Sequence, residues 1–247
     1  MNDMARIQLD QVSVDLPVYS AGSRSLKARL LPSSRVAPGP RHQILVHALR
    51  EITCEFNAGD HVALVGRNGA GKSTLLSVLA GIYEPAYGRV RIEGRIAALL
   101  DLSLGMEEDA TGEENVTMRG RLLGMSPDEI SARMEEIIEF AALGDHIHLP
   151  LRTYSSGMRL RLAFAVSTCV APDVLLLDEV IGVGDAQFAK KAAERMQRLI
   201  QRTQILVVAS HNTQLLAELC NKAIWLEGGR VREMGLASEI MAAYQQS

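Results

Sequence analysis

The sequence predicts an α/β fold with a mainly parallel sheet, an N-terminal antiparallel β part and an inserted helical subdomain. The first observation is HVALVG (residues 61–66), a short apolar strand that leads through a glycine-rich turn into a helical pattern. The second is a pair of similar strands, VLLLDE (residues 174–179) and ILVVAS (residues 205–210), each followed by a helical pattern. The third is a mainly helical stretch over residues 111–170. Strands that alternate with helices favour a parallel sheet.

Length and composition limit the function classes. The chain has 247 residues, which fits a single domain over residues 1–247. Its formal net charge of −3 argues against a globally basic nucleic-acid binder and leaves a local basic patch open. Its three cysteines are far apart in the sequence and form no C-x-x-C pair, so we expect no disulfide, no zinc site and a reducing compartment. The N-terminus lacks the apolar run of a secretory signal, and no apolar run reaches the ~18–20 residues that cross a bilayer.

The N-terminal part begins with an alternating strand and then changes in composition. Residues 7–16, IQLDQVSVDL, carry apolar side chains at every second position, as a half-buried strand does. Residues 17–50 contain no Asp or Glu, six Lys or Arg and four of the eight prolines. This pattern predicts a loop-rich basic insertion, which is either a solvated surface loop or a contact with an anionic membrane surface.

The remaining elements follow in order. A strand is predicted at residues 89–92, and the helical subdomain at about 106–170. Within it, Ser126 and Glu129 form a capping box with Pro127 at the first helical position. Gly228 and Gly229 predict a hairpin turn, and a last helical stretch covers residues 237–245.

A phosphate-binding loop is the clearest functional motif. GRNGAGKS (residues 66–73) matches G-x-x-x-x-G-K-[ST] between a strand and a helix, as the mechanism of this loop requires. Glycines let backbone N–H groups surround phosphates, a lysine reaches the β- and γ-phosphates, and a serine hydroxyl binds Mg²⁺. The predicted ATP-phosphate ligands are Gly66, Asn68, Gly69, Gly71, Lys72, Ser73 and Thr74, with Ser73 also on the metal.

Two acidic residues and a histidine follow the other buried strands. Asp178 and Glu179 end VLLLDE, at the sheet edge where parallel α/β folds bind ligands. We expect Asp178 to hold Mg²⁺ and Glu179 to activate the attacking water. His211 follows ILVVAS and is either a structural residue or a residue that lies near the γ-phosphate.

The order of these motifs resembles that of the ATP-binding cassette (ABC) ATPases. It comprises GRNGAGKS, YSSGM (residues 154–158), VLLLDE, GVGD (residues 182–185) and Ser210-His211, and it covers nearly the whole chain. More narrowly, YSSGMRLRLAFAVS, DEVIGVGDAQFAKK and the basic insertion are similar to ATPase subunits of bacterial polysaccharide exporters.

The resemblance implies roles for further residues. Ser155, Ser156 and Gly157 match the signature loop that contacts the ATP held by a second subunit, Asp185 matches the interface aspartate, and His211 matches the catalytic switch histidine. Asp101 lies closest to the position of the family's missing glutamine and is a further candidate Mg²⁺ ligand. Tyr19 is the candidate for stacking on adenine.

The resemblance also implies a function. We expect an ATPase that uses ATP and Mg²⁺, dimerises with a second copy of itself and lies peripherally at the cytoplasmic face of the inner membrane. There it would join an integral membrane permease and drive export of a lipid-linked polysaccharide, O-antigen being the first candidate, without itself binding free polysaccharide or nucleic acid. The alternatives are export of capsule, teichoic acid, lipid, drug or peptide, a soluble ABC ATPase that acts on DNA or ribosomes, and a small-molecule kinase or GTPase.

Overall fold

A computed structural model describes residues 4–18, 36–38, 44–102, 105–178 and 186–247, which form two compact units. Unit 1 comprises residues 1–94, 176–179 and 204–247, and unit 2 comprises residues 95–175 and 180–203. Tyr19, Glu179 and Asp185 lie outside the described residues. The predicted helical subdomain, residues 106–170, lies within unit 2.

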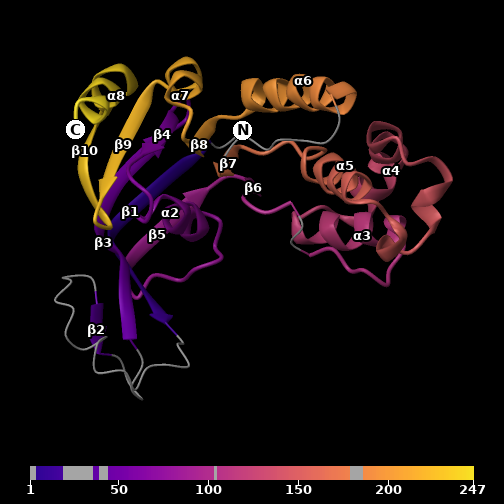
Figure 1. Ribbon diagram of the computed structural model, residues 1–247, viewed down its shortest axis with the longest axis horizontal. Helices are drawn as coiled ribbons and strands as arrows, with labels where there is room; N and C mark the ends of the chain where they lie inside the picture. Colours follow the sequence, from indigo (N-terminus) through magenta and orange to yellow (C-terminus); the bar gives the residue numbers. More distant parts are fainter. Residues whose placement is uncertain (1–3, 19–35, 39–43, 103–104, 179–185) are drawn as a thin grey trace. The chain divides into compact units, whose positions relative to one another are not determined.

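The described part of unit 1 contains two sheets and three helices (Figure 1). Its strands are β1 (Arg6–Val18), β2 (Val36–Pro38), β3 (Ile44–Asn57), β4 (His61–Val65), β5 (Tyr87–Glu93), β8 (Ile205–Ala209), β9 (Lys222–Glu227) and β10 (Arg230–Leu236). Its helices are α2 (Lys72–Leu79), α7 (Thr213–Leu219) and α8 (Ala237–Gln245).

The first sheet of unit 1 is antiparallel, with the order β2-β3-β1-β5. The strand β1 extends the predicted alternation to Val18, and its register places Ile7 opposite Phe56. The structure differs from the sequence prediction at residues 44–50, which were expected to be loop and form the first half of β3. Pairing with β1 stabilises an extended backbone here despite the basic, proline-rich composition of the preceding residues.

The second sheet of unit 1 carries the predicted parallel strands. The strand β4 pairs in parallel with β8 on one side and with β9 on the other, and β10 closes the edge as an antiparallel hairpin partner of β9. The next strand after β8 is β7 (Val174–Asp178), which is connected to β8 through a helix, as parallel strands are. These pairings confirm the predicted combination of a mainly parallel sheet with an antiparallel β part.

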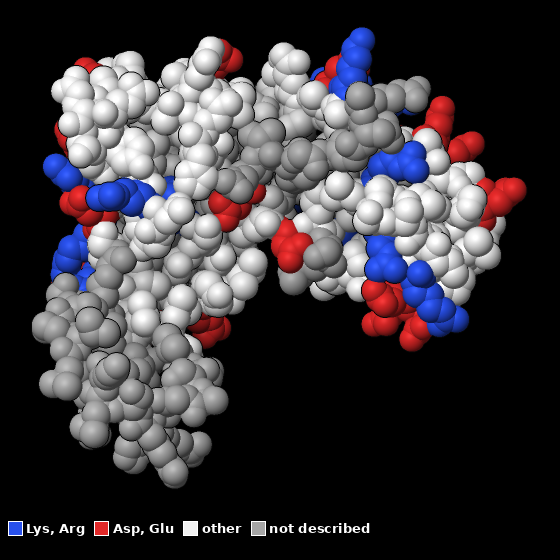
Figure 2. Space-filling view, viewed as in Figure 1, with Lys and Arg blue, Asp and Glu red and all other residues white. Residues whose placement is uncertain are grey.

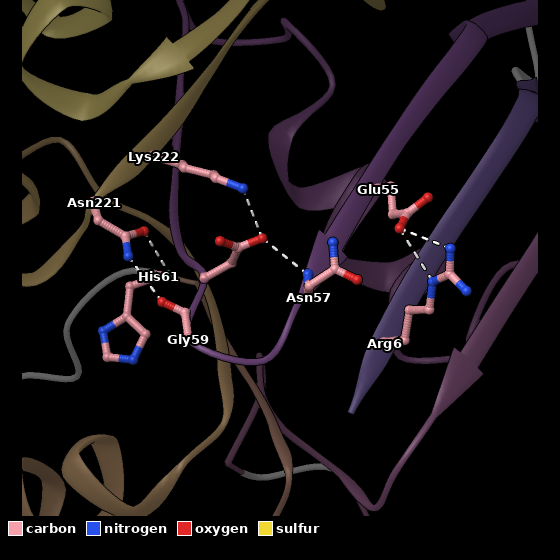
Figure 3. A network of polar contacts seen from close by, with 8 residues as sticks. Arg6, Glu55, Asn57, Gly59, His61, Asn221 and Lys222 are labelled. Atoms are coloured by element: carbon pink, nitrogen blue, oxygen red, sulfur yellow. Dashed lines mark hydrogen bonds and ion pairs between the residues drawn. The ribbon is translucent and has the colours of Figure 1, made fainter. Parts of the chain in front are cut away.

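Polar side chains fix the beginning of β4 (Figure 3). Asp60, which is only 8% exposed, accepts hydrogen bonds from the backbone N–H of Asn57 at 2.9 Å and from Lys222 Nζ at 2.8 Å. Asn221 accepts a hydrogen bond from the N–H of His61 and donates one to the carbonyl of Gly59. Because the buried Asp60 carboxylate has two hydrogen-bond partners, these contacts stabilise the start of β4.

Unit 2 is mainly helical (Figure 1). Its elements are β6 (Ile96–Leu99), α3 (Gly112–Leu122), α4 (Pro127–Ala141), the 3₁₀ turns Gly144–His148 and Leu151–Thr153, α5 (Ser156–Ser167) and α6 (Ala186–Arg202). The predicted capping box of Ser126 and Glu129 is present, and Thr111 and Glu114 form a second one. Phe140, Phe164 and Phe188 pack together with ring centroids 5.4–6.0 Å apart.

Candidate nucleotide-binding site

The predicted phosphate-binding loop joins β4 to α2 in unit 1. Gly66, Gly69 and Gly71 have φ values of 148°, 75° and 113°, which lie in the region that favours glycine. A Cβ atom at Gly66 would lie 2.3 Å from the backbone oxygen of Leu226, and one at Gly71 would lie 2.9 Å from Leu49 Cδ2. The glycines at these two positions therefore let the loop lie directly against neighbouring strands.

The β9–β10 hairpin contacts the phosphate-binding loop. Gly229 donates its N–H to the carbonyl of Ala70 at 3.0 Å and accepts a hydrogen bond from the N–H of Arg50 at 2.7 Å. A Cβ atom at Gly229 would lie 2.6 Å from the carbonyl oxygen of Ala48. The predicted Gly228-Gly229 turn therefore also brings β3 and the phosphate-binding loop close together.

Helix α2 begins without a side-chain cap. Its N-cap residue is Gly71, no side chain caps its first N–H groups, and its first turn contains no acidic residue. By contrast, α3 and α4 each have a full capping box and two acidic residues in the first turn. Helix N-termini ordinarily use such groups to satisfy their first N–H donors, so the bare end of α2 suits an external anion.

Lys72 and Ser73 lie in the first turn of α2. Lys72 Nζ donates a hydrogen bond to the carbonyl of Gly66 at 2.6 Å, so its ammonium group lies across the loop. The side chain of Ser73 is exposed, and that of Thr74 is half-buried. Amides, an ammonium group and a hydroxyl group gathered around one turn fit the phosphates and Mg²⁺ of a nucleotide.

Two other predicted residues end strands of the same sheet. Asp178 is the last residue of β7, and Ser210 and His211 follow β8 directly. The register of β4 and β8 places Leu64 opposite Ala209, so the phosphate-binding loop and His211 both follow the carboxyl ends of adjacent strands. His211 is exposed, and the N-cap residue Asn212 begins α7 immediately after it. The sheet thus brings Lys72, Asp178 and His211 to the edge where parallel sheets bind ligands.

The signature residues and Asp101 lie in unit 2. Ser155 is the N-cap of α5, and its Oγ accepts a hydrogen bond from the N–H of Met158 at 3.2 Å. Asp101 is exposed, and its carbonyl accepts a hydrogen bond from the buried Arg119 at 3.3 Å. The metal-binding role of Asp101 and the contact of Ser155, Ser156 and Gly157 with ATP stay predictions, as do the roles of Tyr19, Glu179 and Asp185.

The family profile described as "ABC transporter" matches residues 49–182, more than half of the chain and including the phosphate-binding loop and β7. The chain belongs to the ABC transporter family. Its enzyme class is accordingly that of an ATPase, and the small-molecule kinase or GTPase alternative is wrong.

Solved structures support the same fold for this ABC transporter chain. It resembles a dimeric ATP-binding cassette solved in a post-hydrolysis state with ADP and Pi, with a TM-score of 0.65 and 18% identity over 94% of this chain and 98% of that one. The ATP-binding subunit of another ABC transporter gives a TM-score of 0.68 and 21% identity over 97% of this chain and 93% of that one.

Curated relatives of this ABC transporter chain are more similar in sequence. It is 44% identical over 90% of its length to the O-antigen export system ATP-binding protein RfbB of Myxococcus xanthus, of which it spans about half (51%). It is 42% identical over 93% of its length to the corresponding protein RfbE of Yersinia enterocolitica, covering 98% of that protein. It is also 34% identical over its full length to the teichoic acids export ATP-binding protein TagH of Listeria monocytogenes, covering 71% of it.

The structure also shows features that the sequence reasoning missed. His47 Nδ1 lies 2.6 Å from Asp15 Oδ1. Arg195, Arg198 and Arg202 line a pocket in unit 2, and their spacing of three and four residues on one helix face was the available signal.

Proposed function

We propose that this chain is the ATP-hydrolysing subunit of an exporter that moves a lipid-linked polysaccharide, O-antigen being the first candidate, across the inner membrane. The bare N-terminus of α2 behind a glycine-rich turn supports ATP binding. The match to RfbE of Yersinia enterocolitica, which extends over nearly both full chains, supports the cargo. Teichoic acid is the second candidate, because the TagH proteins match over the whole of this chain at lower identity.

Each predicted site residue has its own role in ATP binding or hydrolysis. Lys72 exchanges its hydrogen bond to Gly66 for the β- and γ-phosphates, and the first N–H groups of α2 hold the phosphate oxygens. Ser73 Oγ and an Asp178 carboxylate oxygen would hold Mg²⁺, which would supply positive charge that neutralises the phosphates. A Glu179 carboxylate oxygen accepts the proton of the attacking water, and His211 positions that water and the γ-phosphate.

The subunit acts at the cytoplasmic face of the membrane as a peripheral protein. No described helix is long and apolar enough to cross a membrane. We assign translocation to a separate integral membrane permease, because the similar proteins are named as ATP-binding proteins of export systems, and we place two copies of this chain beneath it.

An apolar pocket in unit 2 is our candidate for the permease contact. It has a volume of about 410 Å³ and is lined by Leu102, Met106, Glu108, Leu151, Ser156, Arg159, Leu160 and Ala163. Arg159 Nη1 pairs with Glu108 at 2.7 Å, while the buried Nε of Arg159 has no hydrogen-bond partner in the described chain. Apolar walls with one polar group left to pair suit a partner helix that brings apolar side chains and a hydrogen-bond acceptor.

The function is tested by deleting the gene in its source cell and restoring it as wild type or Glu179→Gln. We expect wild type to restore polysaccharide at the cell surface, and Glu179→Gln to bind ATP within a few-fold of wild type while its turnover falls about 100-fold or more. The lipid-linked polymer should then accumulate inside the cell. Normal surface polysaccharide in the deletion strain would contradict the cargo, and rapid hydrolysis by Glu179→Gln would contradict the assigned base.

A further inference from the structure

A second pocket of unit 2 is lined mainly by arginines. It has a volume of about 170 Å³ and lies between α4, the residues that follow α5, and α6. Its lining residues are Arg133, Glu136, Thr168, Cys169, Val170, Ala171, Arg195, Arg198, Leu199 and Arg202. On the face of this unit that Figure 2 shows, basic and acidic side chains are intermixed, whereas the pocket gathers four guanidinium groups around one carboxylate.

The one carboxylate is already shared between two of the arginines. Glu136 Oε1 lies 2.8 Å from Arg195 Nη2, and Glu136 Oε2 lies 3.7 Å from Arg133 Nη1. Arg198 uses Nε to reach the carbonyl of Glu194 at 3.2 Å. Among the residues that the structure describes, no carboxylate lies within ion-pair distance of Arg198 or Arg202. Three positive charges in the pocket are therefore not neutralised within it.

Local structural roles explain only part of this cluster. Arg195 has an 11% exposed side chain, stacks 4.3 Å above the Phe140 ring and donates Nε to the carbonyl of Thr168 at 3.3 Å. Desolvation lowers the pKa of Arg195, and Glu136 raises it. Arg202 lies in the last turn of α6, where a positive charge complements the helix dipole. Neither role accounts for Arg198, which extends the same face three residues after Arg195.

The pocket also lacks the group that a covalent reaction would need. Cys169 is 3% exposed, and burial raises the pKa of its thiol to about 11 although Arg133 and Arg195 lower it. A thiol with this pKa stays protonated near neutral pH and is a poor nucleophile. Concentrated positive charge in a concave surface instead favours an anion, and the planar guanidinium group matches phosphate oxygens in pairs.

We propose that this pocket binds the phosphate group of a small, multiply charged anion, independently of the phosphate-binding loop of unit 1. The outer arginines Arg198 and Arg202 hold the phosphate oxygens, and Arg195, fixed by Glu136 and Phe140, forms the rear wall. The volume of about 170 Å³ suits a phosphate or pyrophosphate group, since pockets for drug-sized ligands measure about 300–1,000 Å³.

Pyrophosphate is the probe, and the Lys72→Ala chain is the background in which it is titrated by calorimetry, because the phosphate-binding loop would otherwise compete. We expect saturable binding to Lys72→Ala and at least tenfold weaker binding after Arg198→Gln and Arg202→Gln are added. The matched control adds Arg89→Gln and Arg91→Gln, which remove the same charge from exposed positions on β5 and should change the affinity less than twofold. If the double change lowers the midpoint of thermal unfolding, the single change Arg202→Gln, at an exposed residue, is tested in its place.

Three results would overturn the proposal. They are the absence of saturable binding, an affinity unchanged by the α6 variants, and equal weakening by the β5 control, which would indicate general charge attraction.

A second arm uses vesicles of phosphatidylcholine with and without phosphatidic acid. Arginine-dependent binding to the phosphatidic acid vesicles, competed by pyrophosphate, would support the phosphate site with a lipid head group as its source. No arm depends on transport, so the result stands apart from the export function.

Discussion

Two residues of the phosphate-binding loop are both glycine but lie in different surroundings. Gly66 and Gly69 both have positive φ, but a Cβ atom at Gly66 would lie 2.3 Å from the Leu226 oxygen while one at Gly69 would meet nothing within 4 Å. Gly69→Ala should cost about 1–2 kcal/mol of unfolding free energy from backbone strain. Gly66→Ala should lower the free energy of unfolding by about 2 kcal/mol more than Gly69→Ala, because β4 or β9 must shift. It should also weaken ATP binding further. Urea unfolding and nucleotide titration of both variants check this, and equal losses would contradict the assigned contact.

The same residues show how far sequence reasoning reaches. The motif predicts Lys72 and Ser73 because a strand, a turn and a helix must follow one another for the loop to bind phosphate. It does not predict that the Lys72 ammonium rests on the Gly66 carbonyl, or that Gly229 supports Ala70, since those contacts join segments distant in sequence. Glu179 and Asp185 lie outside the described residues, so their roles stay predictions.

At the scale of elements, the features that depend on neighbouring residues were the most predictable. The capping box of α4 and the Gly228-Gly229 hairpin each depend on neighbouring residues, and both are present. The strand over residues 44–50 was missed because its stability comes from pairing with β1, which composition does not show. The arginine pocket was missed because α4 and α6 are separated by more than forty residues, and only their packing brings the guanidinium groups together.

Helix α5 offers an element-scale test of the permease contact. It presents Leu160 to the apolar pocket of unit 2, where a polar side chain would lower the affinity of an apolar partner. We expect Leu160→Gln to reduce the amount of permease that copurifies with the subunit severalfold. Leu149→Gln is the control, because Leu149 is 45% exposed and lies outside the pocket. A thermal midpoint close to that of wild type shows that each variant is folded, and equal copurification of both would place the permease elsewhere.

At the scale of the whole molecule, the residues predicted to bind ATP come from both units of the chain. Lys72, Asp178 and His211 belong to unit 1, whereas the signature residues begin α5 in unit 2. Resemblance to the cassette family implies that the signature residues of one copy complete the site of another. The ATP-bound dimer would then be favoured over separate subunits to the extent that ATP binds the closed form better.

Gly157 is suited to testing this shared site. A Cβ atom there would meet only Ser155 Oγ, at 3.9 Å, so an aspartate should fit within the chain without steric strain. Gly157→Asp should therefore fold normally and fail because its carboxylate repels the γ-phosphate held by the other copy. Lys72→Ala removes the ammonium group from the opposite half of the site. Each variant homodimer has two damaged sites and should be nearly inactive.

A mixed dimer of the two variants distinguishes sites shared between chains from sites within one chain. If each site joins the loop of one chain to the signature of the other, one of its sites carries both changes and the other carries neither. Mixing should then restore part of the ATPase activity, up to about half of wild type if one site turns over alone, and photocrosslinking of an ATP analogue should label one intact site per dimer. If each site lay within one chain, every site in the mixture would still carry one change, and neither activity nor the label at an intact site would return. That result would contradict the shared site even though the family and the fold would stand.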